Sequence, residues 1–167
     1  MFPVSVREQR EAGKVVKRMD QIPRPGDALP RLRLRSLDGK NLDSWSLRQR
    51  RALLILQVRS GAPGASLLTA LADCAEELDW LEVSVWVLSR EGFEPGLRLP
   101  VGWQASVDSV NFAVPDLAAL LADRYGVVYA AWAGPDASAA DIVQTVRLMS
   151  AECPECGGRL WQDLPAP

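Results

Sequence analysis

Histidine is absent from the 167-residue sequence, and its absence removes several kinds of chemistry at once. Histidine is the commonest acid/base residue near neutral pH and the commonest metal ligand in proteins. No apolar run approaches the roughly 20 residues that span a bilayer, so we expect no contact with a membrane. The formal net charge of −2 argues against a general nucleic-acid binder, and no nucleic-acid partner is expected.

Lysine and cysteine are also scarce. Most basic residues are arginine, and together with abundant alanine, leucine, glycine and proline this indicates a bacterial gene of high GC content. The cysteines Cys74, Cys153 and Cys156 do not make the disulfide framework of a small secreted protein. The charged N-terminal stretch is not followed by the apolar core of a secretory signal. We therefore predict a cytoplasmic protein.

The composition is that of a soluble globular protein, with 48% hydrophobic and 24% charged residues. This length suits one domain with an appended arm. Residues 1–24 are predicted to form an N-terminal arm and linker, 25–157 the domain, and 158–167 a C-terminal tail. The arm, Ser5 to Asp20, mixes charged and apolar residues and is predicted to be a helix, either solvated or packed on a partner subunit.

One stretch, Ala52 to Ala72, organises the rest of the chain. The apolar run Ala52–Val58 predicts a buried strand, and a polar turn follows at Arg59–Ser66. Leucines at helical spacing begin at Leu67. Strand, turn and helix in this order form half of a βαβ unit, in which the N–H groups of the helix N-terminus face the turn.

The flanking patterns extend this unit. Glu82–Leu88 is rich in β-branched residues and predicts a second parallel strand. Leu29–Leu42 predicts a hairpin, because leucines and arginines alternate before an Asp-Gly turn. Arg90–Asp108 contains many glycines and prolines and predicts a loop with at most a short helix. Ser138–Ala151 predicts a helix whose apolar face covers the sheet.

The central stretch resembles the active-site segment of the thioredoxin-like superfamily, in particular its redoxin (peroxiredoxin-like) branch. In those proteins a strand leads into a CPxC or single-cysteine turn at the start of a helix. The matching residues here are Ala62, Pro63, Gly64 and Ala65, so the proline is kept and both cysteine positions are alanine. No sulfur at this turn can attack a peroxide or a disulfide.

The resemblance covers about residues 25–157 and implies a thioredoxin-like α/β fold, with a central mixed sheet flanked by helices and an N-terminal hairpin. It favours a hairpin over a helix for residues 117–132, because such folds have two antiparallel strands before the last helix. The peroxiredoxin proline and threonine positions are Ile55 and Arg59 here. Pro115 matches the cis-proline of the family, although an ordinary trans bond is the default for a loop proline.

The sequence Cys153-Pro-Glu-Cys156 is the first feature that could carry chemistry. It is compatible with a redox pair or disulfide, with half of a four-cysteine zinc site that a second subunit completes, or with an inert segment. The partial negative charge at the end of the preceding helix disfavours a reactive thiolate, and so do Glu152 and Glu155.

The second feature is the turn itself. Its helix N-terminal amides, Ser60, Ser66 and the cation of Arg59 suit a small anion, and the alternative is a degenerate loop that keeps only the fold. We therefore expect a non-peroxidase binding or assembly module with a protein partner or second subunit and no cofactor. The alternatives are a thiol–disulfide oxidoreductase using Cys153 and Cys156, or a dimer with an intersubunit zinc site.

Overall fold

A computed structural model describes residues 6–11, 14–19, 24–58, 62–89, 91–93, 98–111, 117–134 and 137–152. Its centre is a five-stranded sheet in the order β10-β9-β5-β6-β7. Strands β5, β6 and β7 are parallel, and β9 runs antiparallel to both β5 and β10. The strands are β5 (Ala52–Val58), β6 (Val83–Ser89), β7 (Gln104–Ser106), β9 (Leu117–Ala122) and β10 (Val128–Ala133).

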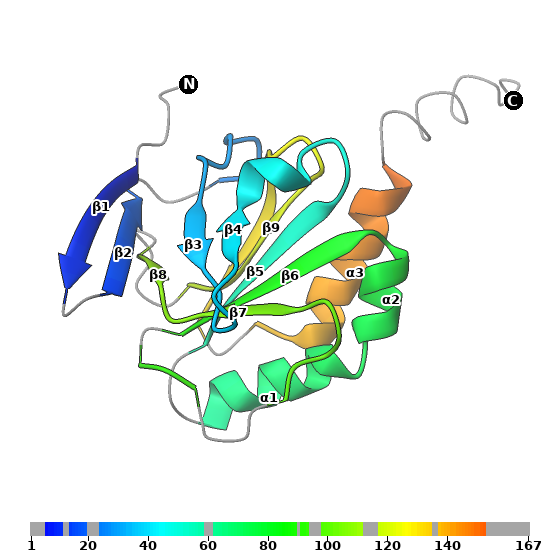
Figure 1. Ribbon diagram of the computed structural model, residues 1–167. Helices are drawn as coiled ribbons and strands as arrows, with labels where there is room; N and C mark the ends of the chain where they lie inside the picture. Colours follow the sequence, from blue (N-terminus) through cyan, green and yellow to red (C-terminus); the bar gives the residue numbers. More distant parts are fainter. Residues whose placement is uncertain are drawn as a thin grey trace, which may run out of the picture.

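Strand β5 is buried on both faces, as its continuous apolar sequence predicts. Leu54 and Leu56 belong to the core beneath the helices, whereas Leu53 and Ile55 belong to the core beneath a small hairpin. Figure 1 shows the helices on one side of the sheet and this hairpin on the other. The elements are α1 (Ala62–Ala72), α2 (Ala75–Trp80), α3 (Ala139–Ala151), β3 (Arg33–Arg35) and β4 (Asn41–Asp43).

The β3–β4 hairpin confirms the prediction made from its Asp38-Gly39 turn. Its register places Leu34 opposite Leu42, and both side chains are buried against the sheet. Asp108 fastens the hairpin to the edge of the sheet, because its Oδ2 accepts the backbone N–H of Arg35 at 2.8 Å. The hairpin therefore covers the face of the sheet on which no helix lies among the described residues.

The C-terminal half of the domain also follows the sequence pattern. Residues 117–132 form a hairpin rather than a helix, since β9 and β10 pair antiparallel. Ser138 caps α3, and its Oγ accepts the N–H of Asp141 at 3.1 Å. The apolar face of α3 is buried as predicted, through Ile142, Val143, Val146 and Met149.

The N-terminal arm differs from its prediction. The helix predicted for Ser5 to Asp20 is not formed, and the chain makes a hairpin of β1 (Val6–Glu11) and β2 (Lys14–Met19). Strand β2 then pairs in parallel with β8 (Ser109–Asn111), far along the sequence. A glycine and three valines in this segment are weak helix formers, and pairing with a distant strand overrides the local preference.

The loop predicted for Arg90–Asp108 contains no helix in its described parts before β7, 91–93 and 98–103. The prediction was wrong at its end, where Gln104–Ser106 form β7 and pair with β6. Helix α1 begins at Ala62, earlier than the expected Leu67. Cys74 lies between α1 and α2, where it is half-buried against the core beneath the helices. In the part of the chain that the structure describes, no helix is long and apolar enough to cross a membrane.

Candidate functional site

The end of β5 at Val58 carries the turn that matches the redoxin active site. Helix α1 starts at Ala62, only a few residues after the strand, so the predicted strand–turn–helix unit is present. Pro63 fits the first turn of α1, where a backbone N–H has no partner within the helix. Ala65 is exposed on the same turn, and its carbonyl accepts the hydroxyl of Thr69 at 2.9 Å. This turn offers no sulfur.

Several predicted site residues lie outside the described residues: Arg59, Ser60, Pro115, Cys153 and Cys156. Their roles as anion ligands, cis-proline, redox pair or zinc ligands stay predictions. Within the described ranges, no group of three or more Cys, Asp or Glu side chains is arranged to hold a metal ion.

The other end of β5, at Ala52, has a different character. A cavity of about 150 Å³ opens there, between the start of β5, the β9–β10 turn and the end of α3. Glu152, the residue before Cys153, lines this cavity. Seven strand residues, or roughly 20 Å, separate this end of β5 from the end that leads into α1. The structure therefore does not bring the end of α3 to the turn between β5 and α1.

The hydroxyl of Tyr129 donates a hydrogen bond to Oε2 of Glu152 at 2.5 Å beside this cavity. The contact joins β10 to the residue that caps the end of α3. The hydrogen bond to Glu152 is the main cause that raises the pKa of Tyr129 to about 12, and burial adds to it. Tyr129 is therefore a protonated donor throughout the physiological range.

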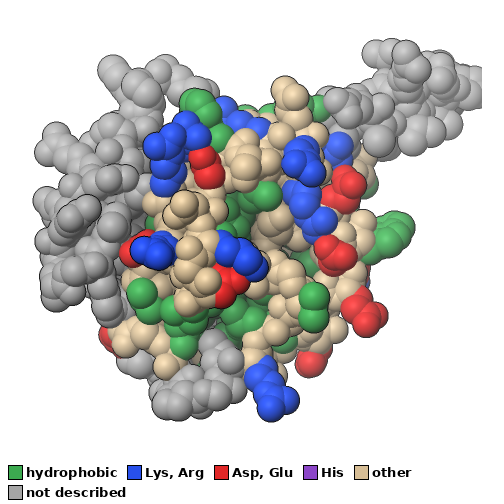
Figure 2. Space-filling view, in the orientation of Figure 1, with side chains coloured by type: hydrophobic (Ala, Val, Ile, Leu, Met, Phe, Trp, Pro, Cys, Tyr) green, Lys and Arg blue, Asp and Glu red, His purple; other side chains and the backbone are tan. Residues whose placement is uncertain are grey.

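A second surface lies on the hairpin side, where Figure 2 shows groups of Lys and Arg side chains. Trp45 is 47% exposed, which is unusual for so large an apolar side chain. The Arg31 guanidinium lies 5.0 Å from the centroid of its ring, and that of Arg48 lies 4.6 Å from it. These cation–π contacts hold the ring in place. We call Arg31, Arg33, Trp45 and Arg48 the tryptophan patch.

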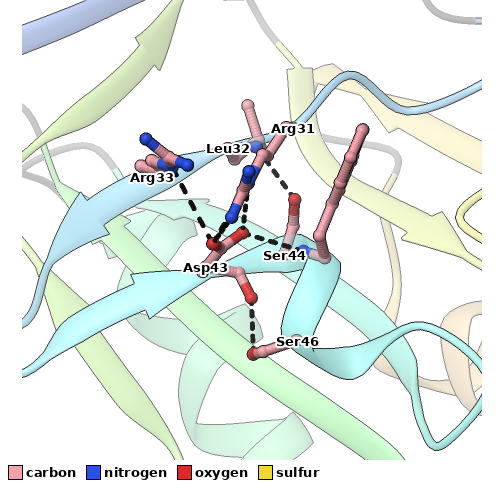
Figure 3. Close-up of polar contacts among 7 residues, drawn as sticks. Arg31, Leu32, Arg33, Asp43, Ser44 and Ser46 are labelled. Carbon is pink, nitrogen blue, oxygen red and sulfur yellow. Dashed lines mark hydrogen bonds and ion pairs between the residues drawn. The ribbon is translucent and has the colours of Figure 1, made fainter.

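Asp43 organises this patch (Figure 3). Its carboxylate accepts three hydrogen bonds from Arg31, two from Nε at 3.0 and 3.1 Å and one from Nη2, and lies 3.8 Å from Nε of Arg33. Its Oδ1 also accepts the N–H of Trp45 at 3.0 Å and caps the short 3₁₀ helix η1 (Ser44–Leu47). The hydrogen bonds from Arg31 lower the pKa of Asp43, so the pair is charged at neutral pH.

Sequence reasoning missed the tryptophan patch. Trp45 gives no signal in a periodicity analysis, because it lies in a short connection between two strands. The signal that could have found it is Asp43-Ser44-Trp45-Ser46, in which an acid precedes a short helical turn and can cap it.

Solved structures of thioredoxin-like proteins share this architecture. BsSco, a member of the Sco family of cytochrome c oxidase assembly proteins, has a TM-score of 0.56 and 16% identity over 78% of this chain and 98% of its own. The mitochondrial 2-Cys peroxiredoxin of Plasmodium falciparum has a TM-score of 0.61 and 10% identity, with coverages of 86% and 100%. A thioredoxin-family thiol:disulfide interchange protein of Chlorobium tepidum TLS has values of 0.55 and 18%, with coverages of 76% and 97%.

These identities establish the fold alone. The chain has the thioredoxin-like fold, and the structures similar to it include redoxin-type proteins, as the sequence predicted. In sequence, the chain matches no family model and no curated protein.

Proposed function

We propose that this protein is a thioredoxin-like binding or assembly module that lacks peroxidase chemistry. The observation that carries the proposal is the pair of alanines, Ala62 and Ala65, in the first turn of α1. A thiolate in that turn would be favoured by the helix N-terminus, and alanine supplies neither a nucleophile nor a resolving thiol. What remains of the redoxin site is a scaffold.

A protein partner is part of the proposal. BsSco is described as a member of a family of assembly proteins, which shows that one neighbour with this fold is associated with assembly. Here the tryptophan patch is the surface that suits a partner, because exposed tryptophan and arginine contribute strongly to protein interfaces. Trp45 is held between Arg31 and Arg48, so little side-chain entropy is lost when a partner covers it.

The test compares partner recovery by the full chain and two variants expressed in the native host. Trp45→Ala removes the centre of the tryptophan patch, and Trp80→Ala is the matched control, because Trp80 is 80% exposed on α2. We expect a protein that is recovered with the wild type and with Trp80→Ala, and is lost with Trp45→Ala. Recovery that is equal for all three forms would contradict the role of the patch.

The second candidate function uses Cys153 and Cys156, as a thiol–disulfide oxidoreductase or as the two halves of an intersubunit zinc site. The C-P-E-C spacing favours it, whereas the C-terminal end of α3 just before Cys153 disfavours a reactive thiolate. Free thiols would be titrated in glutathione buffers of set potential, and zinc would be assayed on the same sample. A reversible two-electron transition near roughly −200 to −300 mV supports the oxidoreductase. Half an equivalent of zinc per chain supports the dimer.

We place the protein in the cytoplasm, since so few cysteines do not suit a secreted disulfide scaffold. Fractionation of the native host under conditions that trap thiols tests this. Free thiols at all three cysteines in a soluble fraction are expected, and a stable disulfide in an exported fraction would contradict it.

A further inference from the structure

The cavity at the Ala52 end of β5 is formed by four separate parts of the chain. Arg50 and Ala52 come from the start of β5, Leu81 and Glu82 from the turn before β6, and Tyr129 from β10. The end of α3 completes it. Its lining combines apolar residues, among them the buried Ala52, with charged side chains. A pocket of this size holds about five water molecules, or a ligand of similar volume.

One residue that lines this cavity, and one that precedes a lining residue in the sequence, have an unusual backbone. Glu82 has φ of 57° and Gln49, the neighbour of Arg50, has φ of 62°. They are the only residues other than glycine with positive φ among those that the structure describes. Glycine would adopt this conformation at lower cost, yet these positions hold long polar side chains. Such backbone strain is concentrated at binding sites in proteins.

Three charged residues around the cavity, Asp123, Glu82 and Arg124, have polar partners within the fold. Asp123 accepts the backbone N–H groups of Tyr125 at 2.8 Å and Val127 at 2.9 Å. Glu82 faces Arg124, with 4.0 Å between Oε2 and Nη2.

Two charged residues of opposite sign remain, whose charged groups accept or donate no backbone hydrogen bond and form no ion pair among the described residues; Asp123 also has no ion pair there, but its carboxylate is occupied by the two backbone N–H groups. Arg50 makes no ion pair with any residue in the described ranges. Glu152 accepts the neutral hydroxyl of Tyr129 and pairs with no cation in the same part of the chain, so its negative charge is not cancelled. Because both residues line the same cavity, it offers one positive and one negative group together with the apolar residues Ala52, Leu81 and Met149.

We propose that this cavity binds a small zwitterion of the α-amino-acid type, with its carboxylate toward Arg50, its ammonium group toward Glu152 and an apolar side chain against Ala52, Leu81 and Met149. A simple anion would be attracted by Arg50 but repelled by Glu152. A simple cation would be attracted by Glu152 but repelled by Arg50. A ligand with both charges satisfies both groups. Among the described residues that line it there is no cysteine and no residue of the tryptophan patch.

The experiment titrates the full chain with L-leucine, 4-methylpentanoate, which lacks the ammonium group, and 3-methylbutylamine, which lacks the carboxylate. Calorimetry measures affinity, and NMR follows the amide signals of residues that line the cavity. We expect L-leucine to bind with a dissociation constant between about 10 µM and 1 mM, and each analogue to bind at least about tenfold more weakly.

Two variants test the proposed contacts of the ligand, one with Arg50 and one with Glu152. Arg50→Gln is expected to weaken L-leucine about tenfold and to leave 3-methylbutylamine unchanged, because the amine has no carboxylate to lose. Glu152→Gln is expected to weaken L-leucine about tenfold and to leave 4-methylpentanoate unchanged. Arg98→Gln is the control, since Arg98 is an exposed arginine that does not line the cavity. Circular dichroism confirms that each variant is folded.

No shift of the cavity signals at about 10 mM L-leucine overturns the proposal, and so does equal binding of L-leucine and its analogues. The variant Cys153→Ser/Cys156→Ser should bind L-leucine as the wild type does. This separates the amino-acid site from any redox or zinc function.

Discussion

The two ends of strand β5 differ in what they offer a ligand. At the Val58 end, α1 begins with Ala62 and Pro63 and provides backbone N–H groups but no reactive side chain. At the Ala52 end, a cavity collects charged side chains from distant parts of the chain, and Glu82 beside it has a left-handed backbone. At the positions of the redoxin cysteines, Ala62 and Ala65 supply no sulfur. The binding site that we propose lies at the opposite end of β5 from the turn that resembles the redoxin active site.

The comparison also shows which residues maintain the scaffold. Leu54 lies midway along β5 and is fully buried between the sheet and the helices. Both ends depend on this shared core, so the absence of sulfur at one end does not remove the need for α1. Helix α1 still contributes Leu68 and Leu71 to the core.

The largest expected effect comes from introducing cysteines at the start of α1, beside the Val58 end of β5. The double variant Ala62→Cys/Ala65→Cys, made in a Cys153→Ser/Cys156→Ser background, should form a disulfide and reduce insulin at least about tenfold faster than its parent. The reason is that a thiol at a helix N-terminus has a lowered pKa. Insulin turbidity and thiol titration measure it. A variant that stays folded and inert would show that the turn lacks more than its sulfur.

The next effect tests whether α1 is still structural. Leu71→Ala removes a side chain with 0% exposure and should lower the free energy of unfolding by about 2–5 kcal/mol. Thr69→Ala, on the exposed side of α1, should change it by less than about 0.5 kcal/mol. Urea denaturation compares the two. Similar values for both would mean that α1 does not pack as described.

A smaller effect is expected from relieving strain at the cavity. Glu82→Gly should raise the free energy of unfolding by about 0.5–1 kcal/mol, because glycine adopts a positive φ without a steric penalty. Gly126→Ala is the opposite case, since Gly126 has φ of 78° and an added Cβ would lie 2.8 Å from Nε of Arg48. It should destabilise the protein in urea. A loss of stability in Glu82→Gly would indicate that the Glu82 side chain itself stabilises the fold.

The smallest effect is a pH dependence at high pH. Folding raises the pKa of Tyr129 from 10.0 to about 12, chiefly through its hydrogen bond to Glu152. The protonated phenol is thus favoured in the folded state, so its stabilising contribution is complete below pH 10.0 and is lost as the pH rises toward about 12. The difference in urea midpoint between wild type and Tyr129→Phe should therefore shrink over this window. A constant difference would contradict the assignment.

Much of the fold could be predicted from local patterns. The apolar run of β5, the Asp38-Gly39 turn and the capped, one-sided helix α3 each specify their structure within a short stretch of sequence. The N-terminal hairpin could not be predicted, because β2 is paired with β8, about ninety residues away, and its own residues carry no strong preference.

The candidate sites also differ in whether local sequence or long-range contacts determine them. The turn between β5 and α1 could be recognised from the sequence, because its residues are consecutive and alanine occupies its cysteine positions. The cavity was not visible, because Arg50, Glu82, Tyr129 and Glu152 come together only through the pairing of the strands and the packing of α3. The left-handed backbone of Glu82 also has no sequence signal, since glycine is the residue that a pattern search expects there.

The most direct test of the central claim is the turnover of hydrogen peroxide and of an insulin disulfide by the wild-type protein, with dithiothreitol or thioredoxin and its reductase as electron donor. Our account predicts no turnover above the rate without protein, and no change on Cys153→Ser/Cys156→Ser. Turnover that the double serine variant abolishes would contradict it and would make Cys153 and Cys156 the catalytic pair.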